Sequence, residues 1–232
     1  MRRRLLGTIN WRYAVGEVAL IVIGILIALA ASEWQAGRAE RRTELALLAD
    51  LRTGLAADHA AARSVLDSYR DIAERLQALL AHMDAGGDET GDLPGWFGAA
   101  YGFQQLGINR AAYESLKSQG LDLVSDPGLR SALARLYEQS LPLAEQSVGV
   151  ERNVVLELLR PFYLRHFRDL RFNVSAQPLD YAALVEDTYF RNLLDYRLQV
   201  LLQNHINTFE TFVPEIEGLL ARLDAELVGD DA

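Results

Sequence analysis

The sequence predicts an all-α protein, with an N-terminal transmembrane helix followed by an antiparallel helical bundle that has long helices and a short-helix insert. Three observations predict this class. An apolar stretch between residues 13 and 32 is long enough to cross a bilayer. Apolar residues then recur every three or four positions, which is the helical period. No segment after Ser32 reads as a β-strand, and the loops are short.

The predicted span extends from Tyr13 to Ser32, which is 20 residues with Glu17 as the one charge. At 1.5 Å per residue a helix of this length covers roughly 30 Å, the thickness of a bilayer core. Aromatic residues that could anchor it at the two interfaces are Trp11, Tyr13 and Trp34. The lipid bilayer is therefore the first expected partner.

Two alternatives to a retained anchor stay open. Ala28-Leu29-Ala30 is a small-x-small site behind an apolar core, so a signal peptide cleaved after Ala30 is one. A buried helix of a soluble protein is the other. The helical pattern continues past Ala30 to Leu45 with only Gly37 as a breaker, which favours retention.

Arginine counts indicate the orientation. Four arginines precede the span, at 2, 3, 4 and 12, and three follow it, at 38, 41 and 42. The positive-inside rule narrowly favours a cytoplasmic N-terminus. We therefore expect a single-pass protein of the bacterial inner membrane: a basic cytoplasmic segment (1–12), the span (13–32), a periplasmic bundle (33–228) and a frayed tail (229–232).

Glu17, Gly24 and Ala28 lie on one side of the predicted span. Gly24 and Ala28 form a small-xxx-small pair, which lets helix backbones approach closely in lipid. Glu17 is either a charge tolerated near the headgroups or part of a contact with another membrane helix. The second interpretation predicts a homo-oligomer or a membrane-protein partner.

Composition narrows the function. The 232 residues include no cysteine, which excludes disulfides and thiolate chemistry. Residues 1–31 carry a net charge of +3. Because the whole chain carries −9, the remaining residues carry −12. Because phosphate contacts need clustered Lys and Arg, this acidic body argues against a nucleic-acid partner.

Three blocks of the sequence resemble a bacterial family of uncharacterised single-pass membrane proteins that contain a domain of unknown function. The blocks are Tyr13 to Trp34, with Y-x-x-x-E-x-x-L-I-V-I-G-I-L-I-A-L, Ala111 to Arg130, and Asp180 to Leu194. The family usually has Gln-x-x-x-Trp after I-A-L, whereas this chain reads A-A-S-E-W. The resemblance implies a retained anchor and a helical domain, and it implies no known activity.

The first half of the body predicts one long amphipathic helix over residues 45–83, followed by a glycine-rich loop over 84–95. The loop has acids at 84, 88, 89 and 92, but their spacing is not that of an EF-hand, which favours a solvated loop over a calcium site. Asn109 can cap a helix over 110–119 that Gly120 ends.

The second half predicts two long helices. Asp126 and Pro127 begin one that runs to about residue 172, with kinks or breaks at Pro142 and Pro161. After a connector over 173–178, the other covers about 180–227, with a bend expected at Pro214.

No catalytic or cofactor motif occurs. The histidines at 59, 82, 166 and 205 match neither H-E-x-x-H nor the E-x-x-H of di-iron bundles. Lys117 reads as an exposed lysine rather than a nucleophile. We therefore expect no enzyme, no cofactor and no metal site.

An aromatic segment over 96–123 contains the candidate pocket or partner surface, Trp96, Tyr101, Tyr113 and Glu114. It reads either as a helical plug that closes the bundle or as a pocket with an aromatic wall. The first interpretation suits an envelope interaction or scaffold protein, and the second a small-ligand-binding or sensor module working with a membrane partner. A structural coiled coil is a third hypothesis.

Overall fold

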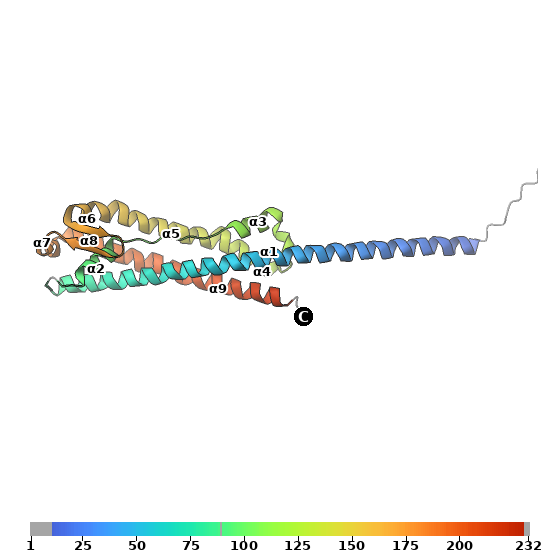
Figure 1. The fold of residues 1–232 in the computed structure, drawn as a ribbon, viewed down its shortest axis with the longest axis horizontal. Coiled ribbons are helices and arrows are strands. Elements are labelled where there is room, and N and C mark those ends of the chain that lie inside the picture. Colours follow the sequence, from blue (N-terminus) through green and yellow to red (C-terminus); the bar gives the residue numbers. More distant parts are fainter. Residues whose placement is uncertain (1–10, 89, 230–232) are drawn as a thin grey trace, which may run out of the picture. The chain divides into compact units, whose positions relative to one another are not determined.

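The computed structural model describes residues 11–88 and 90–229, and within them helices make up nearly all of the regular structure (Figure 1). The all-α prediction is confirmed. The chain forms two compact units, one up to Ala46 and one from Leu47 onward. The predicted basic segment lies outside the described residues up to residue 10, as does the predicted tail from residue 230.

Helix α1 (Trp11–Asp84) joins the predicted span and the predicted amphipathic helix in one element of 74 residues. In the first unit its apolar side chains are exposed: Leu20 is 74% exposed and Ile27 is 64% exposed. The most apolar 18-residue window has a mean hydropathy of 2.5, and none of it is buried. This part of α1 is long and apolar enough to cross a membrane. Residues 33–40, which the sequence assigned to the bundle, are exposed as well.

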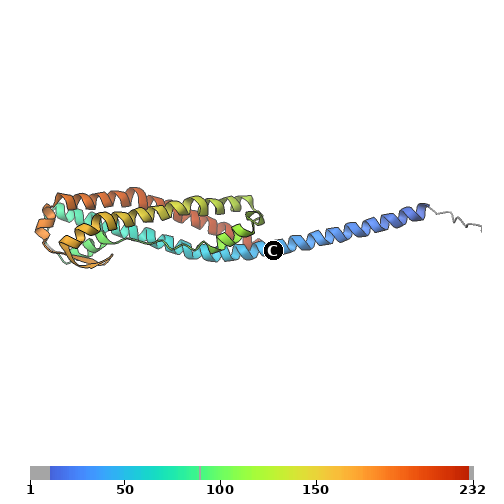
Figure 2. The same cartoon turned by 90° about the horizontal axis from the view of Figure 1, so that it is seen from above.

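The second unit is a bundle of three long helical arms, of which the first two run in the same direction and the third runs antiparallel to both (Figures 1 and 2). The first arm is α1 from Leu47. The second consists of α4 (Pro127–Arg135), α5 (Leu141–Asn153) and α6 (Arg160–His166), and the third of α8 (Thr188–Val200) and α9 (Asn207–Val228). Ion pairs Arg52–Asp224 (2.8 Å) and Arg70–Glu210 (2.6 Å) fix the antiparallel register of the first and third arms.

Wide π-helical turns join the helices within the second and third arms. They are η2 (Leu136–Ser140), η3 (Val154–Leu159) and η4 (Leu201–Ile206). Pro142 and Pro161 each lie two residues after such a turn. A proline cannot donate to the carbonyl four residues earlier, and its ring pushes that carbonyl away. Those carbonyls belong to residues 138 and 157, inside η2 and η3, so the arm widens there and continues without breaking.

The predicted final helix over 180–227 is divided instead at Asp187. Helix α7 (Tyr181–Glu186) ends there, and the Asp187 carboxylate accepts hydrogen bonds from the amides of Tyr189 and Phe190, which caps α8. Pro214 lies inside α9, which continues through it.

A β-hairpin corrects the prediction that no strand follows Ser32. The helix predicted to reach residue 172 ends at His166, and β1 (Phe167–Arg171) pairs antiparallel with β2 (Ser175–Pro178). Asn173 in the turn has a φ of 59°, a left-handed conformation that asparagine tolerates. The hairpin packs on α2 (Leu93–Tyr101).

Two glycines four residues apart permit this packing. A Cβ on Gly98 would overlap the backbone of Ser175, and a Cβ on Gly102 would overlap the side chain of Asn173. The hairpin therefore depends on a tertiary contact that the local sequence of the strands does not show.

The remaining insert follows α2. An extended segment over 102–110, which we call the strap, leads to α3 (Ala111–Gln119) and the 3-10 turn η1 (Leu121–Leu123). The predicted cap at Asp126 is confirmed, since its Oδ1 accepts from the Gly128 amide (2.7 Å). The cap position of α3 is Arg110 instead of the predicted Asn109, although Asn109 Oδ1 accepts from the Ala111 amide (2.9 Å). Gly120 ends α3 with a φ of 108°.

Candidate functional site

A cluster of buried polar side chains lies where the second and third arms meet. Ser147 and Glu151 are one helical turn apart on α5, so both face the core. Arg197 on α8 and His205 in η4 face them from the third arm. Glu151, Arg197 and His205 are 0% exposed and Ser147 is 3% exposed. Buried polar groups require partners, because each one left unpaired costs on the order of 1–3 kcal/mol of stability.

The Arg197 guanidinium satisfies the end of another helix. It donates to the carbonyls of Ala99 (3.1 Å), Ala100 and Gly102, where α2 ends. The last carbonyls of a helix have no partner within it and carry partial negative charge, so a cation fits there. Its second partner is Glu151, whose Oε1 lies 2.6 Å from Nη2. Arg197 therefore ties α2, α5 and α8 together.

Ser147, His205 and Glu151 form a linear series. The Ser147 Oγ lies 2.6 Å from His205 Nδ1, and His205 Nε2 lies 3.5 Å from Glu151 Oε2. Serine, histidine and carboxylate in this order are the groups of nucleophilic catalysis. Here, however, the ring of Tyr69 lies 5.4 Å from the imidazole and Ser147 is almost fully covered. The series holds the Ser147 hydroxyl in place and does not present it to solvent as a free nucleophile.

Two buried carboxylates of the bundle, Glu151 and Asp58, have pKa values shifted in opposite directions. Burial alone would raise the pKa of Glu151, but the charge of Arg197, its hydrogen bond to Oε1 and the nearby His205 outweigh it, so the pKa is lowered. The Oε2 atom of Glu151 and the Nε2 atom of His205, 3.5 Å apart, have no hydrogen-bond partner in the described part of the chain. At Asp58 burial dominates and raises the pKa, although the hydrogen bond from the Asn109 amide (2.9 Å) acts in the opposite direction. Asp58 thus holds the strap against α1, and Glu151 holds Arg197.

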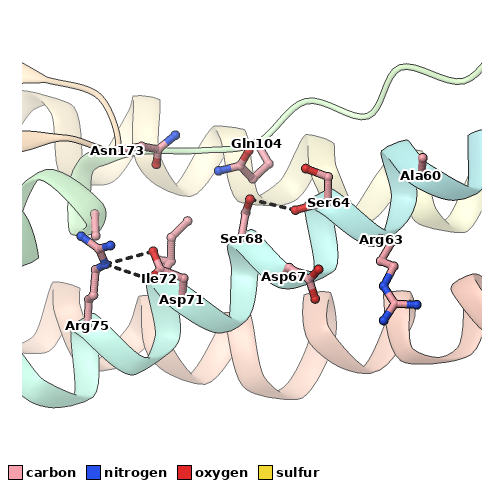
Figure 3. A pocket seen from close by; sticks show the side chains of 11 residues that line it. Ala60, Arg63, Ser64, Asp67, Ser68, Asp71, Ile72, Arg75, Gln104 and Asn173 are labelled. Atoms are coloured by element: carbon pink, nitrogen blue, oxygen red, sulfur yellow. Dashed lines mark hydrogen bonds and ion pairs between the residues drawn. The ribbon is translucent and has the colours of Figure 1, made fainter. Parts of the chain in front are cut away.

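One groove of about 680 Å³ follows α1 beneath the strap (Figure 3). Its α1 wall contains Arg63, Asp67, Asp71 and Arg75, and Gln104 of the strap lies opposite Ser68. The Arg75 guanidinium pairs with Asp71 at 2.9 Å. The two arginines at the ends of this wall and the two aspartates between them compensate each other's charge.

A second groove of about 930 Å³ runs between α5 and the α8–η4–α9 arm, and we call it the amide groove. Nine of its 15 lining residues carry amide or aliphatic hydroxyl side chains, and Leu143 and Val150 add exposed apolar surface to it. Its principal polar members are Gln146, Ser147, Tyr196, Gln199, Gln203 and Asn204. Ser147 thus belongs both to this groove and to the buried series behind it. The volume falls in the range of small-molecule sites, roughly 300–1,000 Å³.

The predicted pocket residues of α2 lie in the core near the hairpin. Tyr101 is buried and stacks on Tyr163 and Phe172, at centroid distances of 4.8 and 4.4 Å. Trp96 is half-buried, and its ring meets the edge of His82 at 5.7 Å.

The predicted pocket residues of α3 lie elsewhere. Tyr113 is buried, stacks on Tyr137 at 4.2 Å and donates to Glu138 at 3.1 Å, whereas Glu114 is exposed. Neither pair lines the amide groove or the groove in Figure 3. The buried rings fit the plug interpretation, and the pocket interpretation stays a prediction.

The predicted membrane-helix contact lies in the first unit. Glu17 and Ala28 are exposed there, and a Cβ on Gly24 would meet nothing within 4 Å. This face is thus free in the described part of the chain, and its contact with another helix stays a prediction.

Sequence reasoning missed Glu151, Arg197 and Ser147. A signal was present: Arg197 falls on the apolar stripe of its helix, four residues from each of the buried residues Leu193 and Leu201. A polar residue at a core position is the pattern that identifies such a cluster.

Comparison with known proteins adds no relative: no protein-family model matches the chain, and neither a curated protein nor a solved structure is similar to it. Among the described residues, no group of three or more His, Asp or Glu is placed to hold a metal ion.

Proposed function

We propose that this chain is a membrane-anchored interaction or scaffold protein of the bacterial envelope, with its helical bundle on the periplasmic side of the inner membrane. The observation that carries the proposal is the exposure of the apolar side chains in the first part of α1. Ten Val, Leu and Ile residues between Val15 and Leu29 are 48–74% exposed. Full burial of each is worth about 1.5–3 kcal/mol, so a lipid environment would stabilise this helix by on the order of 10 kcal/mol or more.

The residues after the apolar part suit a membrane interface. The Arg38 guanidinium lies 4.1 Å from the centroid of the Trp34 ring. Tryptophan and arginine at the end of a span are typical of the headgroup region, where the ring stays partly apolar and the cation meets lipid phosphates.

Scaffolding is favoured over catalysis by what the buried polar groups do. Arg197 and Glu151 are used in holding α2 to the bundle, and Asp58 in holding the strap. These contacts make a rigid body from segments far apart in the sequence, which suits presentation of a fixed surface to a partner.

Topology can be tested by labelling. The chain has no cysteine, so Ser131→Cys, at an exposed site on α4, introduces a single thiol. A membrane-impermeant maleimide added to spheroplasts should label it without lysis. Labelling only after lysis would show the opposite orientation, with the bundle in the cytoplasm. Recovery of the labelled protein in the soluble fraction would refute the anchor.

Association can be tested in the same membranes. Cross-linking should capture a second copy or a membrane protein, and the capture should fall when Gly24 and Ala28 are both replaced by Ile. Ala19→Ile, a change of the same kind on the opposite side of the span, is the matched control. Equal capture by the control and the double variant would refute the role of the Glu17–Gly24–Ala28 face.

The amide groove favours a second candidate function, a ligand-binding or sensor module. Its supporting observation is the lining of five amide side chains, which offer donors and acceptors to a ligand.

A further inference from the structure

Three inter-arm grooves run along the bundle, and contacts within this chain bridge two of them. Ion pairs span the groove between α1 and α9, including Arg52–Asp224 and Arg70–Glu210. The strap lies between α1 and α5, where the Asn109 amide binds Asp58 and Arg110 pairs with Glu145. The amide groove between α5 and the third arm has neither a strap nor a row of ion pairs across it in the described part of the chain.

We propose that the amide groove binds a neutral oligosaccharide rich in hydroxyl and acetamido groups. Its 15 lining residues include five amide side chains and four serine or threonine hydroxyls. Amides offer two donors and an acceptor each, which matches the mixed donors and acceptors of a sugar. Glu215 is the one carboxylate of the lining, and Arg135 lies 4.0 Å from it. A charged ligand would find no strong counter-charge in this lining.

The polar side chains of the third arm form a continuous ladder. Gln203 Nε2 donates to Gln199 Oε1 at 2.7 Å, and Thr211 Oγ1 donates to the Asn207 carbonyl at 3.1 Å. These groups are one helical turn apart, about 6 Å, and they are exposed. A linear ligand with hydroxyls along its length can exchange these weak surface hydrogen bonds for its own, one residue after another.

Tyr196 supplies an apolar face at one end of the ladder. It lines the groove and is 51% exposed. An aromatic ring with a polar tip can cover the C–H face of a sugar ring while its hydroxyl stays hydrogen-bonded. The combination of one exposed aromatic ring with many amides distinguishes this groove from the charged wall in Figure 3.

Local structure supports a binding role. Two of the π-helical turns border the groove, since Ser140 belongs to η2 and Gln203 and Asn204 belong to η4. Such turns are rare and occur frequently at functional sites. The η4 turn also carries His205, so the residues that line the groove and the one that fixes Ser147 share a single backbone element.

Binding is tested with the full chain in nanodiscs, since maltoside detergents would compete as sugars. The probe is the β-1,4-linked tetramer of N-acetylglucosamine, with tetragalacturonate as the anionic control, and binding is read by ligand-observed NMR and titration. The double variant Gln203→Leu/Asn204→Leu should bind the tetramer at least about 10-fold more weakly, since two hydrogen-bonding groups are lost. Gln104→Leu in the other groove is the matched control and should bind as the parent does.

Thermal melting of each variant separates loss of binding from loss of the fold. The proposal is overturned if the neutral tetramer does not bind at about 10 mM, near the weak limit for a small ligand. Preference for tetragalacturonate, or an equal loss in Gln104→Leu, would also overturn it. A change of oligomeric mass in the double variant with no sugar binding would assign the groove to a partner helix instead. None of these outcomes depends on the membrane anchor, so this test can fail while the proposed anchoring stands.

Discussion

The two buried carboxylates of the bundle should respond in opposite directions when their charges are removed. Glu151 lies beside the guanidinium of Arg197 and has a lowered pKa. Asp58 has no cation at hydrogen-bonding distance among the described interactions, its Oδ2 is buried without a hydrogen-bond partner, and its pKa is raised. The comparison is therefore between Glu151→Gln and Asp58→Asn, two isosteric changes in one domain.

The size of the Glu151 effect follows from its partner. Glu151→Gln leaves the fully buried Arg197 without a counter-charge, which costs about 3–5 kcal/mol. For a unit of 186 residues (232 − 46), each kcal/mol lowers the melting temperature by roughly 2–4 °C. We expect a decrease of roughly 6–20 °C at neutral pH, in the lower half of that range because glutamine keeps one acceptor for Arg197. Asp58→Asn keeps the acceptor for the Asn109 amide and removes a desolvated charge, so its melting temperature should not fall.

The pH dependence has a definite sign. Because the folded pKa of Glu151 lies below its ordinary value of 4.5, its carboxylate stabilises the fold above that pH, and this contribution is lost as the pH falls through the folded pKa. The gap between wild type and Glu151→Gln should therefore close in acid. For Asp58 the folded pKa is raised above 3.8, so ionisation costs stability as the pH rises, and any advantage of Asp58→Asn should be largest at neutral pH.

Melting of the full chain in micelles, followed by circular dichroism between about pH 3.5 and pH 8, measures both differences. Equal melting of Glu151→Gln and wild type at neutral pH would refute the argument that Arg197 depends on this charge. A gap that widens in acid would refute the assigned sign. A lower melting temperature for Asp58→Asn than for wild type would show that burial does not dominate the pKa of Asp58.

Four further substitutions test the packing, a helix cap and an exposed ion pair by the same melting assay. Gly98→Ala should cost about 1–3 kcal/mol of stability, because its methyl would overlap the hairpin backbone. Gly54→Ala is the control: its methyl meets nothing within 4 Å, so it should gain about 0.5–1 kcal/mol. Similar effects of the two substitutions would contradict the α2–hairpin contact. Asp126→Ala should cost about 1 kcal/mol through loss of the cap on α4, and an unchanged melting temperature would remove that cap from the account. Arg70→Gln breaks an exposed ion pair and should change stability by less than about 1 kcal/mol, with a large loss showing that the pair does more than fix register.

Much of the fold could be predicted because it is encoded locally. The 3.6-residue period predicted the three arms, Gly120 and Asp126 located helix ends correctly, and Asn109 located the start of α3 to within one residue. These features depend on neighbours a few residues away, which the sequence displays directly.

The errors have a common cause in long-range contacts. The hairpin depends on Gly98 and Gly102, which lie more than 70 residues before Ser175 and Asn173 in the sequence. The local sequence pattern of the strands therefore does not predict the hairpin. Likewise, Arg197 reaches the end of α2 from nearly 100 residues away. The predicted aromatic residues were correctly recognised as a cluster in sequence, but the fold distributes Tyr101 and Tyr113 between different ring stacks.

The most direct measurement is the intact mass of the chain recovered from alkaline-washed membranes. Retention of the anchor predicts a membrane-bound product at the full mass of 25.9 kDa. A product in the soluble fraction that begins near Ala31 would show that the apolar part of α1 is a cleaved signal, and the proposed membrane scaffold would be wrong.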